Sequence, residues 1–133
     1  MSVVLDACAM LAALRGEPGA QVVRHLLREN RGACYAHSLN VCEVFYGICR
    51  ERGLPTAQRA VRVLAGFGIA FREDMDQLFW EDIGLLKATN RVSLADAVCL
   101  GLARWLGADL YTSDHHEFDA IASTAGCQIR FIR

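Results

Sequence analysis

Lysine is nearly absent from this 133-residue chain, which carries thirteen arginines and a single lysine. Its fourteen basic residues are balanced by fifteen acidic ones, and the formal net charge of -1 excludes a strongly basic, polyanion-binding surface over the whole molecule. Arginine forms forked contacts with phosphate and carboxylate, so a local basic rim remains compatible with this near-neutral total. Most of the arginines are nevertheless expected simply to solvate helix faces.

The chain also lacks long apolar runs and closely spaced cysteine pairs. No segment approaches the ~20 consecutive apolar residues of a membrane-spanning helix. Only Val3-Val4-Leu5 precedes Asp6, too short a run for a signal peptide. The six cysteines form no C-x-x-C pair, which argues against zinc knuckles and thioredoxin-type sites. We therefore expect a cytoplasmic protein, without membrane association, whose cysteines serve as small core side chains in a reducing environment.

Composition favours one folded domain over residues 1–133. The chain is 53% hydrophobic and 22% charged, which is typical of a globular protein and excludes a disordered one. Its length suits a single hydrophobic core. Only two prolines occur, Pro18 and Pro55, and both are expected in loops.

Short apolar segments alternate with longer segments of helical periodicity along the chain. The pattern predicts strands over 3–5, 33–36, 69–71, 109–112 and 128–132. It predicts helices over 9–15, 20–28, 38–52, 56–65, 75–89, 93–106 and 116–122. Ser38 is the expected N-cap of the third helix and Gly107 the expected end of the sixth. Leu78, Phe79, Ile83 and Leu86 recur at helical spacing within 75–89. Such alternation predicts a mostly parallel sheet covered by helices.

Four acidic residues lie in otherwise apolar surroundings: Asp6, Glu43, Asp96 and Asp114. A carboxylate rarely accepts apolar neighbours unless its charge is compensated. Asp6 and Asp114 each follow a predicted strand, and ligands of parallel sheets bind beyond the carboxyl ends of the strands. Two carboxylates ~4 Å apart repel by ~4 kcal/mol at an effective dielectric constant near 20. A cluster of them therefore implies a bound cation or strongly raised pKa values.

Each acid also has a purely structural interpretation. Asp6 and Asp114 could end their strands as turn residues. Ser93 and Asp96 resemble a helix capping box, although a cap of this kind could still turn one oxygen toward a metal ion. Glu43 shares a helical stripe with Asn40, and this stripe fits a solvated face as well as a site. The site interpretation gains weight because four such acids occur together.

Several residues near the fourth acid are candidates for supporting roles. Thr112 offers a hydroxyl that could orient a carboxylate. His115 and His116 are adjacent and so point apart, which favours surface positions. Glu117 and Asp119 are further acids in the same loop, and either could assist a second metal ion, although a solvated position is favoured for Glu117.

At these residues the sequence resembles the PIN-domain ribonucleases, and more narrowly the VapC toxins of VapBC toxin–antitoxin systems. The resemblance covers the whole chain. It includes the opening segment 4–7 with the first acid, Glu43 as the second acid, and segment 94–97 with the third. Segment 112–114, followed by 115–119, is similar to the motif of the fourth acid and is the most specific stretch.

One position departs from the family pattern. Cys8 stands two residues after the first acid, where the family usually has serine, threonine or asparagine. A thiol is a weak hydrogen-bonding group. The sequence therefore leaves open how Asp6 is held.

The resemblance implies an α/β fold, a PIN-like three-layer sandwich in which helices flank a small, mostly parallel sheet. It implies a Mg²⁺- or Mn²⁺-dependent endoribonuclease that hydrolyses RNA with a metal-activated water. Asp6, Asp96 and Asp114 would hold the ion, while Glu43 would complete its shell or help to bind a second ion. Apart from the resemblance, Arg15 and Arg91 are candidates for contacts with flanking phosphates near the rim of such a site.

The same resemblance implies two protein partners. One is a VapB-type antitoxin whose tail covers the acidic pocket, and the other is a second copy of the chain. The helix expected over 38–52 is apolar over more than half its circumference, which fits a second packing side such as a subunit interface.

Three other functions are compatible with parts of the pattern. A structure-specific DNA nuclease could use the same acids, but the chain lacks the long insertions that such enzymes use to clamp DNA. A phospho-acceptor receiver domain would need a lysine near its last strand, whereas Lys87 falls in a predicted helix. A non-catalytic PIN-like interaction module would be expected to have lost one of the acids, and none is missing.

Overall fold

Five short strands form one parallel sheet in the order β3-β2-β1-β4-β5. The structure is a computed structural model that describes residues 1–133. The strands are β1 (Val3–Leu5), β2 (Cys34–His37), β3 (Ile69–Arg72), β4 (Asp109–Thr112) and β5 (Ile129–Phe131). The helices are α1 (Ala7–Arg15), α2 (Ala20–Glu29), α3 (Ser38–Arg52), α4 (Leu54–Gly66), α5 (Gln77–Thr89), α6 (Leu94–Leu106) and α7 (His115–Phe118).

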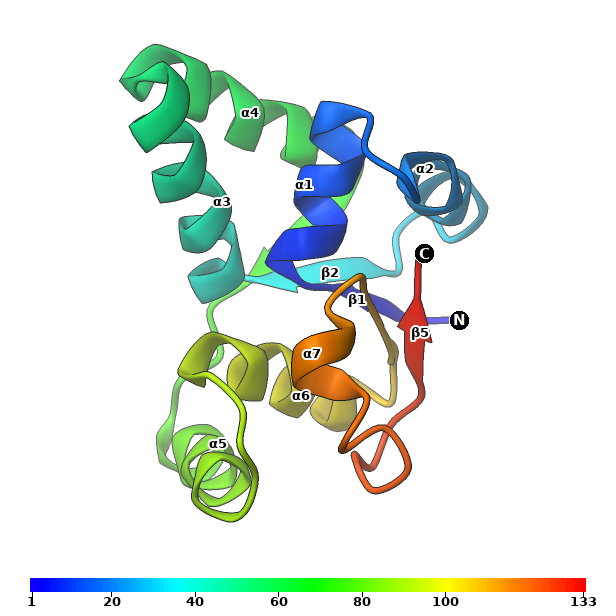
Figure 1. The fold of residues 1–133 in the computed structure, drawn as a ribbon, viewed down its shortest axis with the longest axis vertical. Coiled ribbons are helices and arrows are strands. Elements are labelled where there is room, and N and C mark those ends of the chain that lie inside the picture. The colour runs from blue at the N-terminus through cyan, green and yellow to red at the C-terminus, as the bar shows by residue number, and fades with distance from the viewer.

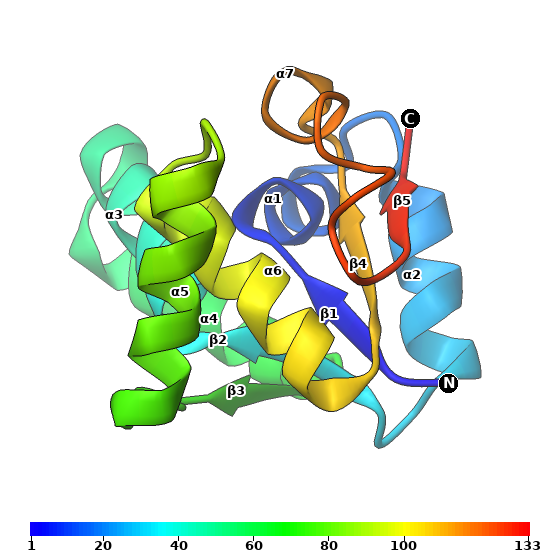
Figure 2. The ribbon, with the colours of Figure 1, turned by 90° about the horizontal axis from the view of Figure 1, so that it is seen from below.

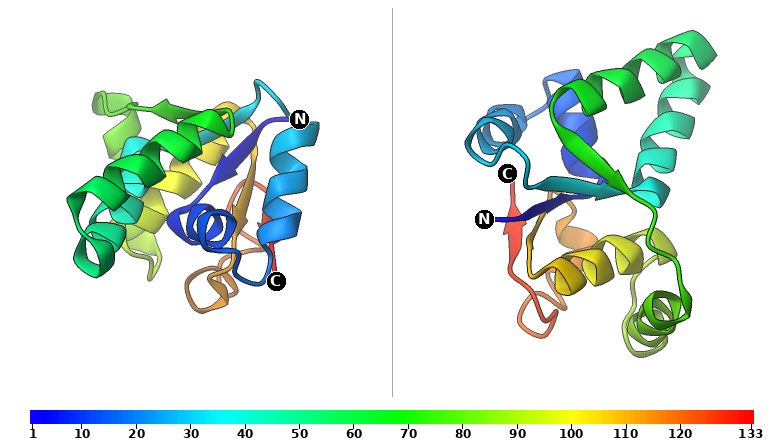
Figure 3. Two further views of the ribbon diagram at one scale, coloured as in Figure 1. Left: turned by 90° about the horizontal axis from the view of Figure 1, so that it is seen from above. Right: turned by 180° about the vertical axis from the view of Figure 1, so that it is seen from behind.

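Helices cover both faces of the sheet and create two separate cores (Figures 1 and 2). The central strand β1 shows why, since successive side chains of a strand point to opposite faces. Val3 and Leu5 are fully buried with α1, α2, α3 and α4, while Val4 is fully buried with α5, α6 and the segment after β4. Figure 3 shows the same three layers from above and from behind. The expected three-layer α/β sandwich is confirmed, and its sheet is entirely parallel.

Capping residues fix where several helices begin and end. Asp6 caps α1 by accepting a hydrogen bond from the Ala9 amide, and Ser93 caps α6 by accepting one from the Asp96 amide. Gly107 ends α6 in the left-handed conformation, as its position in the sequence predicts. Asp6 is therefore held as the cap of α1, and Asp96 is held in the first turn of α6.

Two expectations about helix starts were wrong. The N-cap of α3 is His37, whose Nδ1 accepts a hydrogen bond from the Leu39 amide at 3.0 Å, while Ser38 already has helical backbone geometry. Pro55 lies inside the first turn of α4 and not in a loop. Proline is tolerated there because the first amides of a helix have no partner within the helix.

Two expectations about burial were also wrong. Helix α5 starts after its cap Asp76, and its buried side chains are Phe79, Ile83 and Leu86, whereas Leu78 is 70% exposed. Cys42 is exposed on α3, so not every cysteine belongs to a core. All six cysteines are free thiols, and no helix has the length and apolar character needed to span a bilayer.

The last predicted helix is shorter than expected. Its hydrogen-bonded turn spans only His115–Phe118, and the chain then continues through turns to β5. Asp114 caps this turn by accepting a hydrogen bond from the Glu117 amide at 3.1 Å. The neighbouring strands β1 and β4 pair Leu5 with Tyr111, so the acids that follow these strands emerge at the same sheet edge.

The α1–α2 loop approaches the C-terminal end of the chain closely at one glycine. Gly19 has φ +96°, and a Cβ built there would lie 2.8 Å from Ile132 Cγ1 and 2.9 Å from the Ile132 carbonyl oxygen. Gly16 in the same loop has φ +66° but open space around a Cβ.

Replacing Gly19 with alanine should therefore destabilise the fold by more than ~1 kcal/mol, because positive φ and a backbone clash combine. Gly16→Ala, the matched control, should cost less because it carries only the backbone strain. Thermal unfolding of both variants checks this, and equal melting temperatures would contradict the close approach to Ile132.

Candidate active site

The first acid is almost completely buried at the end of the central strand. Asp6 is 2% exposed, and its Oδ1 accepts a hydrogen bond from the Ala9 amide at 2.8 Å. Its Oδ2 accepts a hydrogen bond from the Thr112 hydroxyl. Both carboxylate oxygens are therefore fixed by the polypeptide before any ligand binds.

Thr112 connects the first acid to the fourth. Its hydroxyl donates to Asp6 and at the same time accepts a hydrogen bond from the Asp114 amide at 2.9 Å. Thr112 is itself fully buried, so this bridge forms away from solvent. The arrangement answers how Asp6 is held: a hydroxyl from β4 does so, and Cys8 is not needed.

Cys8 is present at the site as a neutral thiol. Burial, assisted by the charges of Asp6 and Asp114, raises the pKa of its thiol to about 12. A protonated thiol is a weak hydrogen-bonding group and a poor metal ligand. The position therefore adds bulk beside Asp6 and no negative charge.

The third acid lies in the first turn of α6. The Asp96 amide donates to Ser93 Oγ at 3.1 Å, as the capping-box pattern predicts. Burial raises the pKa of the Asp96 carboxyl to about 6, helped by the charges of Glu117, Asp114 and Glu43. The electrostatic coupling shows that acids from α3, α6 and the segment after β4 share one region.

Glu117 was expected in a solvated loop, and this expectation was wrong. It is half-buried, and its charge raises the pKa of Asp96 more than any other carboxylate does. Asp119, in contrast, is exposed and binds His115, with 3.0 Å between its Oδ1 and the histidine Nδ1. Of the two additional acids, Glu117 is the one electrostatically linked to the third acid.

The second acid is held by an asparagine on the same helix. Asn40 is fully buried on α3, and its amide group donates to Glu43 Oε1 and to the Ala95 carbonyl oxygen, both at 3.1 Å. Both partners are acceptors, so the orientation of the amide is fixed. Asn40 thus ties Glu43 to the residue that precedes Asp96.

Asn40 also presents a buried acceptor without a donor. Its Oδ1 is the only buried side-chain nitrogen or oxygen atom in the protein that has no hydrogen-bond partner. Such an atom normally acquires a partner, often a water molecule. The helical stripe that Asn40 shares with Glu43, three residues further on, is the one local signal for this role.

The pKa of the first acid reflects the lack of any nearby positive charge. Burial raises the pKa of Asp6 from 3.8 to about 7, and the hydrogen bonds from Thr112 and Ala9 offset only part of this effect. The charges of Asp96 and Asp114 raise it further. The ionised site is thus destabilised electrostatically, and a cation would relieve that cost.

The chemistry of the donors fits a hard divalent ion. The four acids and Asn40 supply oxygen atoms, the ligands that Mg²⁺ and Mn²⁺ prefer. No three His, Cys, Asp or Glu side chains lie close enough together to hold one ion between them. An ion that keeps several of its waters and uses one or two carboxylates directly, as Mg²⁺ commonly does, is compatible with this spacing.

Comparison with known proteins identifies the family. The family model of the PIN domain matches residues 3–123. The chain belongs to the PIN-domain family. PIN domains generally use divalent metal ions, in agreement with the oxygen-rich donor set described above. No curated protein sequence matches the chain significantly.

Solved structures of VapBC complexes and VapC toxins share this PIN fold. VapBC2 from Rickettsia felis, bound to a DNA fragment from its promoter, has a TM-score of 0.76 at 16% identity and covers 98% of each chain. VapBC-1 from nontypeable Haemophilus influenzae has a TM-score of 0.74 at 19% identity, covering 99% of this chain and 98% of that one. VapC20 from Mycobacterium tuberculosis, a sarcin-ricin loop cleaving toxin, has a TM-score of 0.69 at 17% identity, covering 90% and 95%.

Burial of Asp6 makes the stability of the metal-free PIN domain depend on pH. The folded-state pKa of about 7 lies above the unfolded value near 3.8, so the folded state retains a proton that the unfolded chain has released between these values. The contribution of Asp6 to stability is complete below pH ~4 and is lost as the pH rises through 7.

The variant Asp6→Asn should therefore melt at a higher temperature than the wild type at pH 8 in EDTA. One pKa unit corresponds to ~1.4 kcal/mol, so the gain should reach a few kcal/mol. The advantage should shrink toward pH 4.5, where the wild-type carboxyl is protonated. Thermal melts across this pH range provide the measurement, and a difference that does not vary with pH would contradict the burial of an uncompensated charge.

The variant Thr112→Val tests the bridge between the first and fourth acids. Valine keeps the shape of threonine but removes the hydroxyl that serves both Asp6 and the Asp114 amide. We expect a loss of ~1–3 kcal/mol in the free energy of unfolding at pH 8 and a further rise in the pKa of Asp6.

Urea unfolding and carboxyl NMR titration measure these two effects. Thr124→Val removes a hydroxyl whose bond to the Ile121 carbonyl oxygen is long, 3.4 Å, and it serves as the control. Equal stability of the two valine variants would rule out a structural role for the bridge.

Proposed function

We propose that this PIN domain, spanning residues 1–133, is a Mg²⁺- or Mn²⁺-dependent endoribonuclease and the toxin of a toxin–antitoxin system. The observation that carries the proposal is that acids from distant segments lie close enough to interact. Burial and the nearby charge of Asp114 raise the pKa of both Asp6 and Asp96, so ionising these two carboxyls is costly without a cation. The sarcin-ricin loop cleavage named for VapC20 supports RNA as the substrate class.

The four acids have different roles in binding the ion. Asp6, Asp96 and Asp114 would contact it directly or through water, and Glu43 would complete its surroundings or help with a second ion. When bound, a divalent ion supplies Lewis-acid chemistry: it lowers the pKa of an attacking water and offsets the charge that develops on the phosphoryl group. No covalent intermediate on a protein side chain is required.

The neighbouring polar residues keep these acids in place. Thr112 fixes the Asp6 carboxylate and the backbone of Asp114, while Asn40 fixes Glu43 beside the start of α6. The unpartnered Oδ1 of Asn40 can accept a hydrogen bond from a water molecule near the ion. Such outer contacts set the direction of metal-binding oxygens. Asp119 remains a candidate auxiliary acid, although His115 already engages it.

We further propose a VapB-type antitoxin and a second copy of the chain as partners, in the cytoplasm. The VapBC complexes among the structures of the same fold support the first. Exposed apolar side chains on two helices, Tyr46 on α3 and Leu78 and Leu85 on α5, support the second. The apolar arc predicted for α3 thus leaves part of its surface open.

Asp96→Asn should reduce metal-dependent cleavage of RNA at least ~100-fold while leaving the fold intact, because it removes a charge that the ion would neutralise. Asp76→Asn is the matched control, since Asp76 begins α5 by accepting an amide hydrogen bond and does not belong to the acid cluster. Its rate should remain within a few-fold of wild type. Asp119→Asn, run alongside, tests the auxiliary role.

The substrate should be total cellular RNA, incubated with Mg²⁺, Mn²⁺ or EDTA, with single-stranded DNA in parallel. Discrete RNA fragments that require both metal and Asp96 are the expected result. Cleavage of DNA alone would replace the proposal with a DNA nuclease. Intact RNA and DNA under every condition would replace it with a non-catalytic interaction module.

A further inference from the structure

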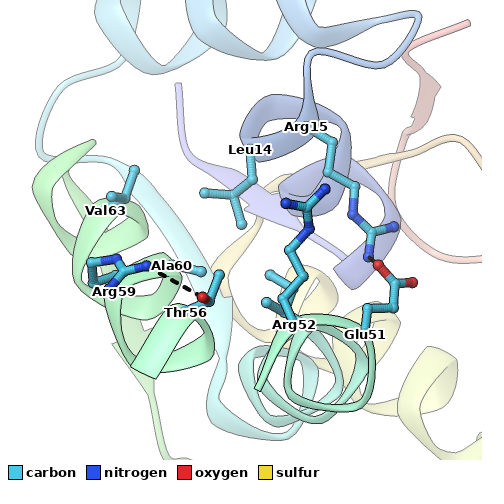
Figure 4. Close-up of a pocket in the computed structure, with 9 residues that line it drawn as sticks. Leu14, Arg15, Glu51, Arg52, Thr56, Arg59, Ala60 and Val63 are labelled. Carbon is cyan, nitrogen blue, oxygen red and sulfur yellow. Dashed lines mark hydrogen bonds and ion pairs between the residues drawn. The ribbon is translucent and has the colours of Figure 1, made fainter. Parts of the chain in front are cut away.

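A cavity of about 610 Å³ lies away from the acids, between the far ends of α1 and α3 and the side of α4. Its floor is apolar and its rim is charged (Figure 4). It is lined by Leu14, Arg15, Ile48, Glu51, Arg52, Thr56, Arg59, Ala60 and Val63.

The rim carries more positive charge than its protein partners balance. Three arginines and one glutamate give the lining a net charge of +2, in a chain whose total is -1. Arg15 pairs with Glu51 at 2.9 Å. Arg59 donates only to the Thr56 hydroxyl, at 3.2 Å, and Arg52 forms no ion pair with any carboxylate. Figure 4 shows the Arg52 side chain extending from α3 on the side of the cavity where Arg15 pairs with Glu51.

The open face of α1 leads from the acids to this cavity. The only side chains of α1 that reach solvent are Cys8, Leu11, Leu14 and Arg15. Cys8 adjoins Asp6 and Asp114, while Arg15 lies seven residues further on, a rise of ~10 Å along the helix. Figure 1 shows α1 and α3 beginning at the same edge of the sheet. Their last residues, Arg15 and Arg52, both line the cavity.

The facing helix α3 leaves space along the same path. Glu43, Gly47 and Glu51 follow one another at intervals of four residues and so lie along one side of α3. A Cβ built on Gly47 would meet no atom within 4 Å. At position 47, midway between Glu43 and Glu51, the sequence therefore places no side chain on this side of the helix.

We propose that Arg15, Arg52 and Arg59, with Thr56, form a phosphate-binding subsite for an RNA strand whose scissile bond lies at the acids. The inference rests on the proposed function, because it assigns the path of that substrate. A basic surface beside the acids would attract the flanking phosphates of the substrate, which the ion at the acids does not contact. Arginine forks match phosphate oxygens, and the apolar floor offers a place for a sugar or base.

Binding can be measured without cleavage by using Asp96→Asn as the background protein. Fluorescence anisotropy with a 12-nucleotide single-stranded RNA in Mg²⁺ gives the dissociation constant at several salt concentrations. The pair Arg52→Gln and Arg59→Gln removes two rim charges. The control pair Arg62→Gln and Arg104→Gln removes two exposed arginines that do not line the cavity.

The double variant of Arg52 and Arg59 should weaken RNA binding roughly tenfold. It should also reduce the slope of log K against log salt concentration by ~1.4, because each of the two lost phosphate contacts contributes ~0.7. The control pair should stay within about twofold of the background protein. Equal effects of the two pairs would overturn the proposal. It would be overturned equally if the rim pair left RNA binding unchanged but abolished binding of an acidic peptide such as poly-glutamate.

A second comparison tests the path itself. Gly47→Phe should obstruct the route along α3 and weaken RNA binding, whereas Gly84→Phe on α5, where a Cβ is equally unobstructed, should not. Identical binding by these two variants would also overturn the proposal. Because this experiment measures binding, it separates the two proposals. If RNA affinity depends on the rim arginines but the wild type cleaves no RNA, only the proposed nuclease function is contradicted. If the wild type cleaves RNA but its affinity does not depend on the rim arginines, only this subsite is contradicted.

Discussion

The burial of one carboxylate, Asp6, at the end of the central strand is the constraint on which the site depends. Strand β1 lies between two cores, so the residue that follows it and caps α1 has little access to water. One amide and one hydroxyl satisfy both of its oxygens, yet its pKa still rises to about 7 because no positive charge is near. The same geometry that makes the metal-free site unfavourable when ionised makes it receptive to a divalent cation.

The net charge of the chain does not show how its acidic and basic residues are distributed over the fold. Helix α1 is capped by Asp6 and ends at Arg15, whereas α3 carries Glu43 in its second turn and arginines in its last turn. The helix dipole favours basic residues at the ends of both helices. The fold then gathers the helix starts at the edge of the sheet and the helix ends around the cavity against α4. A chain with a total charge of -1 can therefore present an acidic centre at one end of α1 and a basic rim at the other. The nearly equal numbers of basic and acidic residues excluded a basic surface over the whole molecule. They did not exclude a local separation of positive from negative charge.

Much of the fold followed from pattern, and the errors have local physical causes. The alternation of apolar strands and periodic helices was enough to predict the three layers, because both kinds of element bury side chains at fixed intervals. His37 replaced Ser38 as a cap because an imidazole nitrogen can accept the same amide hydrogen bond. The four acids stood out as exceptions to apolar surroundings. Asn40 did not, because its decisive contact is with Ala95, 55 residues away, and no local pattern reports such a contact.

The most direct test of this account is the number of protons released when Mg²⁺ or Mn²⁺ binds. Isothermal titration calorimetry at pH 6.5, in buffers of different ionisation enthalpy, gives that number. If the ion compensates the buried carboxyls, wild-type protein should release on the order of one proton per ion, since bound ligands must be deprotonated. The release should fall sharply in Asp6→Asn. Saturable binding without proton release, or no saturable binding at all, would contradict the claim that these acids form a metal site.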